Sequence, residues 1–127
     1  VRVQLQAGFN MSANETPLSP EEVESFLVGR STYAFDPVTR ERVASVTYCS
    51  NGVCTTQFET GGSDDGEWGI TGDTYWTKYQ AFRDGSRNVF YLIWVSADLV
   101  QAYFEDGTRA FLQSGQPELG RVQNERS

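Results

Sequence analysis

Short strand-like segments alternate with tight turns along most of the chain, and this alternation is the feature that most constrains its fold. The pairs Asn51-Gly52, Gly72-Asp73, Asp84-Gly85 and Asp106-Gly107 recur after residue 30. Such pairs supply the backbone angles that tight hairpin turns need. Consecutive hairpins form a meander, in which each strand pairs with the next. The predicted strands are rich in β-branched and aromatic residues and cover residues 31–35, 42–49, 53–59, two segments within 67–82, 88–95, 99–104 and 108–113.

A meander of about eight strands readily closes on itself and so removes its edges. We therefore predict an all-β fold, an antiparallel up-and-down meander barrel with one short N-terminal helix. A two-layer open sheet or sandwich is the alternative. Ser19 can cap the helix and Pro20 suits its first position, while an apolar side follows at helical spacing at Val23, Phe26 and Leu27. We expect this helix to cover one end of the barrel.

The 127 residues fit one domain, and a domain of this size can bury a core without help from a metal or cofactor. Residues 1–17 show little periodicity and are predicted to be a partly ordered leader. The barrel domain is predicted over residues 18–113, and residues 114–127 form a polar tail. No cofactor is predicted.

The charge of the chain argues against two classes of partner. The formal net charge is −7, and Lys78 is the single lysine. Nucleic-acid affinity comes largely from basic groups that displace counterions, so neither nucleic acid nor an anionic membrane is expected to bind. No apolar run approaches the roughly 20 residues that a spanning helix needs, and we predict no membrane span.

Catalytic and metal-binding patterns are also weak. The sequence contains no histidine, the commonest general base and metal ligand. Most acidic residues fall in predicted turns, where turn chemistry explains them. The acidic segment 62–67 could offer carboxylates to calcium but lacks the spacing of a calcium loop, and we interpret it as a solvated turn. Arg30, Arg42 and Arg109 could bind a carboxylate ligand, with surface salt bridges as the simpler interpretation. We predict a non-enzymatic protein without a metal site; an enzyme acting through carboxylate and tyrosine is the minor alternative.

The two cysteines flank the Asn51-Gly52 pair. With these two residues as a two-residue turn, Cys49 would lie directly opposite Cys54, close enough to be bridged. We therefore predict a Cys49–Cys54 cross-strand disulfide, with two free thiols as the alternative. A disulfide favours an extracytoplasmic location, so the protein is predicted to be secreted or periplasmic.

Several segments together resemble a known family. The chain has Phe26-Leu-Val-Gly29 entering the first strand, a meander with Gly66-Glu-Trp68-Gly-Ile70 and Trp76, and a final stretch from Tyr103 to Phe111. This order resembles the lipocalin-like (calycin) β-barrels, and more narrowly a group of small exported bacterial domains of unknown function. The resemblance covers roughly residues 18–113 and implies the barrel fold and a cavity within it.

The chain carries many aromatic residues, 8 Phe, 6 Tyr and 3 Trp. They could line an apolar pocket with polar tips that orient a ligand, or they could fill a solid barrel. The first reading predicts a small apolar or amphipathic ligand in the barrel; the alternative is a protein–protein interaction or inhibitor module with a solid core and an unknown partner. Trp68 is expected in the core, and the predicted ligand-binding residues of the barrel interior are Tyr33, Trp76, Tyr79, Tyr91, Trp94 and Tyr103.

Overall fold

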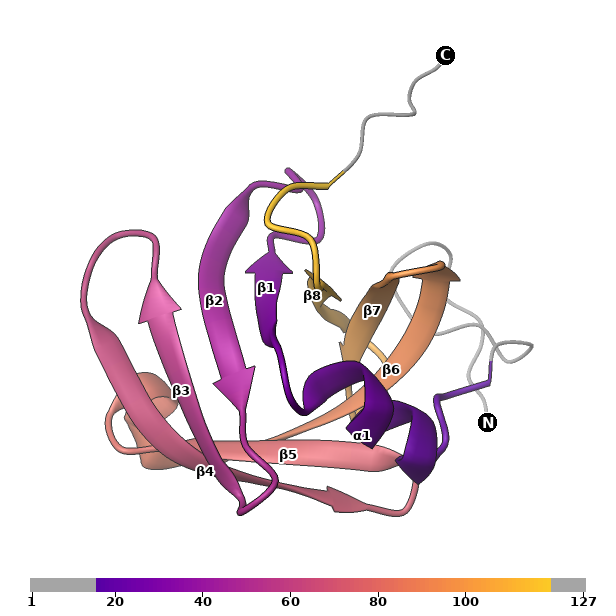
Figure 1. The fold of residues 1–127 in the computed structure, drawn as a ribbon, viewed down its shortest axis with the longest axis horizontal. Coiled ribbons are helices and arrows are strands. Elements are labelled where there is room, and N and C mark those ends of the chain that lie inside the picture. The colour runs from indigo at the N-terminus through magenta and orange to yellow at the C-terminus, as the bar shows by residue number, and fades with distance from the viewer. Residues whose placement is uncertain (1–15, 120–127) are drawn as a thin grey trace.

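The computed structural model describes residues 16–119, and these form a closed barrel of eight antiparallel strands in sequential order (Figure 1). This confirms the predicted fold class. The leader up to residue 15 and the tail from residue 120 lie outside the described residues. The elements are α1 (Pro20–Leu27), β1 (Ser31–Phe35), β2 (Arg42–Tyr48), β3 (Val53–Phe58), β4 (Ser63–Thr71), β5 (Thr74–Tyr79), a short 3₁₀ helix η1 (Phe82–Gly85), β6 (Arg87–Ser96), β7 (Leu99–Phe104) and β8 (Arg109–Ser114).

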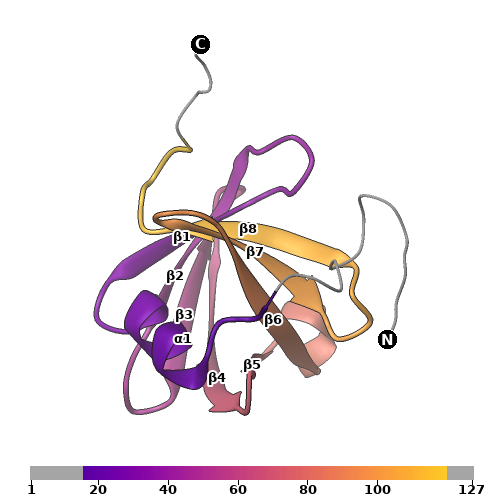
Figure 2. The ribbon, with the colours of Figure 1, turned by 90° about the vertical axis from the view of Figure 1, so that its right-hand side faces the viewer.

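The barrel closes where β1 pairs with β8, through Tyr33 opposite Ser114 and Ala34 opposite Gln113 (Figure 2). Side chains then alternate between the interior and the outer surface, as the pleat of a strand requires. In β5, for example, Tyr75, Thr77 and Tyr79 are buried, while the residues between them are more exposed.

Helix α1 closes one end of the barrel. Ser19 and Glu22 form a reciprocal capping box, and Pro20 occupies the first turn, which satisfies amides that have no partner inside the helix. Val23, Phe26 and Leu27 are buried in the main core cluster with barrel residues such as Tyr48 and Trp68. The predicted helix, its role as a cover and the core position of Trp68 are confirmed.

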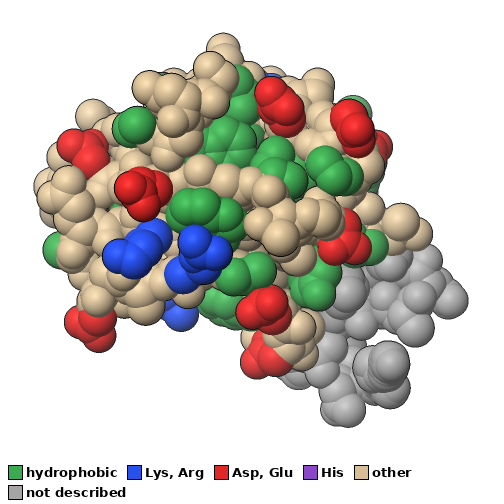
Figure 3. Space-filling model, turned by 90° about the horizontal axis from the view of Figure 1, so that it is seen from below, with side chains coloured by type: hydrophobic (Ala, Val, Ile, Leu, Met, Phe, Trp, Pro, Cys, Tyr) green, Lys and Arg blue, Asp and Glu red, His purple; other side chains and the backbone are tan. Residues whose placement is uncertain are grey.

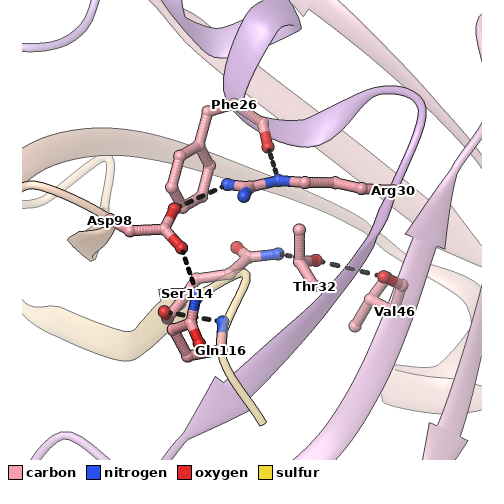
Figure 4. Close-up of polar contacts among 8 residues, drawn as sticks. Phe26, Arg30, Thr32, Val46, Asp98, Ser114 and Gln116 are labelled. Carbon is pink, nitrogen blue, oxygen red and sulfur yellow. Dashed lines mark hydrogen bonds and ion pairs between the residues drawn. The ribbon is translucent and has the colours of Figure 1, made fainter. Parts of the chain in front are cut away.

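Polar contacts tie this helix to the strands beneath it (Figure 4). Arg30 donates to the Phe26 carbonyl at 2.9 Å and to the Asp98 carboxylate at 2.8 Å. Gln116 donates to the other Asp98 oxygen at 3.3 Å. The α1 end is therefore held both by apolar packing and by an ion pair between Arg30, in the connection from α1 to β1, and Asp98 of the β6–β7 turn.

The β2–β3 hairpin differs from the prediction by one residue. The amide of Cys49 donates to the Val53 carbonyl, and the loop has three residues, with Gly52 at a φ of 89°. Tyr48, rather than Cys49, is paired with Cys54.

This register separates the cysteines. Cys54 is buried, Cys49 is exposed, and both are free thiols, because a one-residue shift sends a side chain to the opposite face of the sheet. The predicted Cys49–Cys54 disulfide is therefore wrong. The secreted or periplasmic location stays a prediction, and the unbonded cysteines remove the argument that a disulfide offered for it.

Strand β4 also begins earlier than predicted. It starts at Ser63, so Asp64 and Asp65 belong to the strand rather than to a solvated turn. Asp64 accepts hydrogen bonds from the amides of Ala81 at 2.9 Å and Phe82 at 2.7 Å. The carboxylate of Asp64 therefore anchors the start of η1, which lies far from α1 in Figure 1.

The outer surface carries hydrophobic, basic and acidic side chains. Figure 3 shows one side of it, where hydrophobic side chains lie exposed between basic and acidic ones. Within the described part of the chain, no helix has the length and apolar character that crossing a membrane requires.

Candidate binding cavity

A cavity of about 320 Å³ lies in the half of the barrel that faces away from α1. Its mouth lies where β1 connects to β2, β3 to β4, β5 to β6 and β7 to β8. The lining residues are Ala34, Val43, Ala44, Val46, Tyr48, Thr56, Phe58, Thr77, Tyr79, Phe82, Arg83, Asn88, Phe90, Phe104, Ala110 and Phe111.

Aromatic rings supply much of the cavity wall. The ring centroid of Phe90 lies 5.6 Å from that of Phe104 and 5.1 Å from that of Phe111. At the mouth, Phe82 of η1 lies 5.2 Å from Phe58 and 5.6 Å from Tyr79. Rings at these spacings pack favourably through edge and offset contacts, so the wall is apolar and supported on several sides.

Two irregularities in the sheet enlarge this wall. The β1–β2 register shifts between Ala34 and Phe35, which leaves Val43 as an extra residue in β2. The β7–β8 register shifts between Ala102 and Tyr103, which leaves Ala110 as an extra residue in β8. Both extra residues line the cavity. Bulges of this kind bend strands at barrel rims and next to binding sites.

Polar groups interrupt the apolar wall at several points, and one of them is the phenol of the buried Tyr48. The hydroxyls of Thr56 and Tyr79 are hydrogen-bonded at 2.5 Å, and burial raises the pKa of the Tyr79 phenol. The Asn88 amide donates to the Thr77 hydroxyl at 3.2 Å. Arg83 is the one charged lining residue, and its guanidinium lies 5.2 Å from the centroid of the Phe104 ring.

The structure places one of the six predicted ligand residues, Tyr79, in the cavity wall. Tyr33, Trp76, Tyr91 and Tyr103 alternate with interior residues along their strands and do not line the cavity. Arg87 covers the Trp76 ring at 4.0 Å, and Tyr103 is buried at 8% exposure. Trp94 lies at the α1 end, 5.6 Å from Phe26 and 44% exposed. The six residues are therefore not brought together, and their part in binding a ligand stays a prediction.

Two of the arginines that the sequence suggested as ligand-binding residues lie in salt bridges and not at the cavity. Arg30 pairs with Asp98 at 2.8 Å and Arg42 with Glu59 at 3.0 Å, so salt bridges account for both. The cation at the cavity is Arg83, for which the described residues show no salt bridge to a carboxylate. The sequence signal that could have identified it is its place beside Phe82 in the longer connection between β5 and β6.

The sequence analysis counts phenylalanines among the aromatic residues that could line a pocket but does not include them in the predicted site, and it does not identify Asn88. Phe58, Phe82, Phe90, Phe104 and Phe111 all line the cavity, whereas the predicted set holds tyrosines and tryptophans alone. The available signal was the alternation within β6 and β7, where Phe90 and Phe104 are neighbours of Tyr91 and Tyr103.

A second, shallower hollow of about 300 Å³ lies beside α1. Glu22, Phe26, Arg30, Trp94 and Asp98 line it together with Ser25. Among residues 16–119, no group of three or more Cys, Asp or Glu side chains is arranged to hold a metal ion.

Comparison of the chain with protein-family models, curated proteins and solved structures gave no significant match. The closed eight-stranded antiparallel barrel is compatible with a lipocalin-like fold. The cavity is therefore the feature of the molecule that bears most directly on function.

Proposed function

We propose that this protein is a non-enzymatic, lipocalin-like binder of a small apolar or amphipathic molecule, which it holds in the cavity at the open end of the barrel. The observation that carries the proposal is the cavity of about 320 Å³ with a mostly apolar, aromatic wall. Cavities of about 300–1,000 Å³ lined in this way, with a few polar groups, are typical of small-molecule sites.

The size of the cavity limits the ligand. An engineered cavity of about 150 Å³ in another protein holds one benzene molecule. A cavity roughly twice that size accommodates two fused rings or a short alkyl chain, but not the whole of a long-chain lipid. A longer ligand would have to extend through the mouth, past Phe82 and Arg83.

The test is to fill the cavity. Ala44 is buried and lines it, whereas Thr47 on the same strand is exposed on the outer face. Naphthalene and decanoate, one apolar and one amphipathic probe, are titrated into the wild type and followed by NMR chemical shifts of the cavity residues. We expect binding by the wild type and by Thr47→Phe, and a loss of at least tenfold in affinity for Ala44→Phe.

The proposal fails if neither probe binds the wild type, or if Ala44→Phe binds as well as Thr47→Phe does. Circular dichroism and urea unfolding of both variants establish that each is folded.

A second candidate function is contact with another protein through the hollow beside α1. The observation that favours it is the exposure of Trp94, at 44%, in a hollow that the acidic Glu22 also lines. Such a surface suits a partner that offers a basic side chain with an apolar stem. A photo-crosslinking residue at position 94 should capture one partner protein, and the yield of this crosslink should fall at high salt. The same residue at position 53, which is also exposed, should not capture that partner.

A further inference from the structure

We infer that the ligand is a small aromatic molecule that carries a neutral N–H donor, and that Asn88 recognises this donor through its side-chain oxygen. The inference rests on the proposed function and concerns the same cavity. Asn88 is 5% exposed and lines the cavity.

The orientation of the Asn88 amide follows from its neighbours. The nitrogen Nδ2 lies 3.2 Å from the Thr77 hydroxyl and 3.5 Å from the carbonyl oxygens of both Thr77 and Ser86. Backbone carbonyls only accept hydrogen bonds, so the NH₂ group must face them. The reversed amide would place its oxygen against two other oxygens.

This orientation leaves Oδ1 of Asn88 without a donor among the described residues. Buried amide oxygens are normally hydrogen-bonded, and leaving one unpaired is unfavourable. Thr56 and Tyr79, which also line the cavity, are already joined by their own hydrogen bond. Asn88 therefore provides the cavity with an acceptor that a bound molecule can satisfy.

The charge of the wall limits the kind of donor. No lining residue is acidic, and Arg83 is cationic, so an ammonium group would enter without a counter-charge and beside a like charge. A neutral N–H avoids this cost. The phenylalanine rings around Phe90 favour a flat aromatic body, and the cavity volume admits two fused rings.

Three probes of nearly identical shape test the inference. Indole carries an N–H donor, indene has a CH₂ group in its place, and benzofuran has an oxygen acceptor there. By isothermal titration calorimetry we expect indole to bind the wild type at least about tenfold more tightly than indene, since a buried acceptor is left unpaired by indene. Benzofuran should bind most weakly, because its oxygen would face another oxygen.

Two variants assign the preference to Asn88. Asn88→Leu keeps a side chain of similar size, and we expect its indole-to-indene ratio to fall to near one. Gln57→Leu removes an exposed amide from β3 and should leave the ratio unchanged. If Asn88→Leu does not fold, the three probes on the wild type still decide the question.

Equal affinity of the wild type for indole and indene would overturn the inference, because it would show that the ligand N–H does not donate to Oδ1 of Asn88. That result would leave the proposed function intact. Loss of all binding, including that of naphthalene and decanoate, would overturn both.

Discussion

Cys49 and Cys54 show how a single residue of register sets chemical behaviour. Cys54 points into the barrel, is fully buried, and has its Sγ 3.6 Å from the Glu67 carbonyl oxygen. Burial raises the pKa of the Cys54 thiol to about 11. Cys49 is exposed at the hairpin loop. Because the thiolate is the reactive form of cysteine, the two thiols should differ sharply in reactivity.

We predict that iodoacetamide modifies the native protein once, at Cys49, at about pH 8, where a thiol with a raised pKa stays protonated. The second adduct, at Cys54, should form after unfolding in guanidinium chloride. Intact mass and peptide mapping check both steps. A protein that takes up no label without reductant, and whose mass is lower by two hydrogens, would mean that the cysteines are bonded and that the hairpin register is different.

The predicted ligand residues show that a sequence pattern can separate the two faces of a strand without identifying the face that lies inside the barrel. Alternation correctly indicates that Tyr91 and Phe90 occupy opposite faces of β6, but it does not say which face is inside. The predicted site consists of tyrosines and tryptophans because their polar tips can orient a ligand. Such side chains also suit the outer face, where the apolar body covers the sheet and the tip reaches water. The interior buries phenylalanines such as Phe90 beside Tyr48 and Tyr75, so residue type alone does not separate the two faces.

At the scale of elements, η1 forms part of the cavity mouth and depends on Asp64 of the neighbouring strand. Hydrogen bonds from the amides of Phe82 and Ala81 lower the pKa of the Asp64 carboxyl. Arg83 and Asp84 both have positive φ angles, 55° and 59°, which are unfavourable for residues other than glycine. The anchoring hydrogen bonds therefore hold a segment that has little regular structure of its own.

The sign of the pH effect follows from this lowered pKa. A carboxyl whose pKa is lower in the folded state stabilises the fold above its ordinary pKa of 3.8. That contribution is lost as the pH falls through the folded value. In Asp64→Asn the amide oxygen can still accept the hydrogen bonds, but it does not titrate.

We predict that the free energy of unfolding of the wild type falls more steeply than that of Asp64→Asn as the pH is lowered from neutral to below the ordinary Asp value. Urea unfolding at a series of pH values measures the difference. Asp73→Asn, an exposed substitution in the β4–β5 turn, should retain the wild-type slope. Equal slopes for the wild type and Asp64→Asn would show that this carboxylate does not anchor η1.

Strand number, strand order and the helix were predictable because each depends on local signals, namely alternation, turn pairs and the Ser19 capping box. The β2–β3 register was not. Asn51-Gly52 fits a two-residue and a three-residue loop, and Gly52 supplies a positive φ in either case. The register is instead set by which side chains the barrel buries, here Tyr48 and Cys54. Likewise, the bulges at Val43 and Ala110 depend on how the sheet bends to close, which no short segment specifies.

At the scale of the whole molecule, the two ends of the barrel differ in how completely their side chains are buried. The α1 end is filled by side chains that are almost completely buried, including Val23 and Leu27, both at 0% exposure. The opposite end encloses the cavity and exposes part of its wall, with Phe82 at 42%. We therefore expect stability to depend mainly on the closed end and ligand affinity mainly on the open end.

This division is testable with one variant at each end. Leu27→Ala should lower the free energy of unfolding by about 2–5 kcal/mol, because it removes a fully buried side chain from a packed core. Under conditions where this variant is folded, its affinity for naphthalene should stay within about twofold of the wild-type value. Phe82→Ala should cost about 1 kcal/mol or less, since its ring is partly exposed, yet weaken naphthalene binding several-fold by removing a ring from the mouth. Urea unfolding and titration of the two variants give all four values. If Leu27→Ala weakened binding as much as Phe82→Ala did, the two ends would be coupled, and the cavity could not be treated as separate from the core that α1 closes.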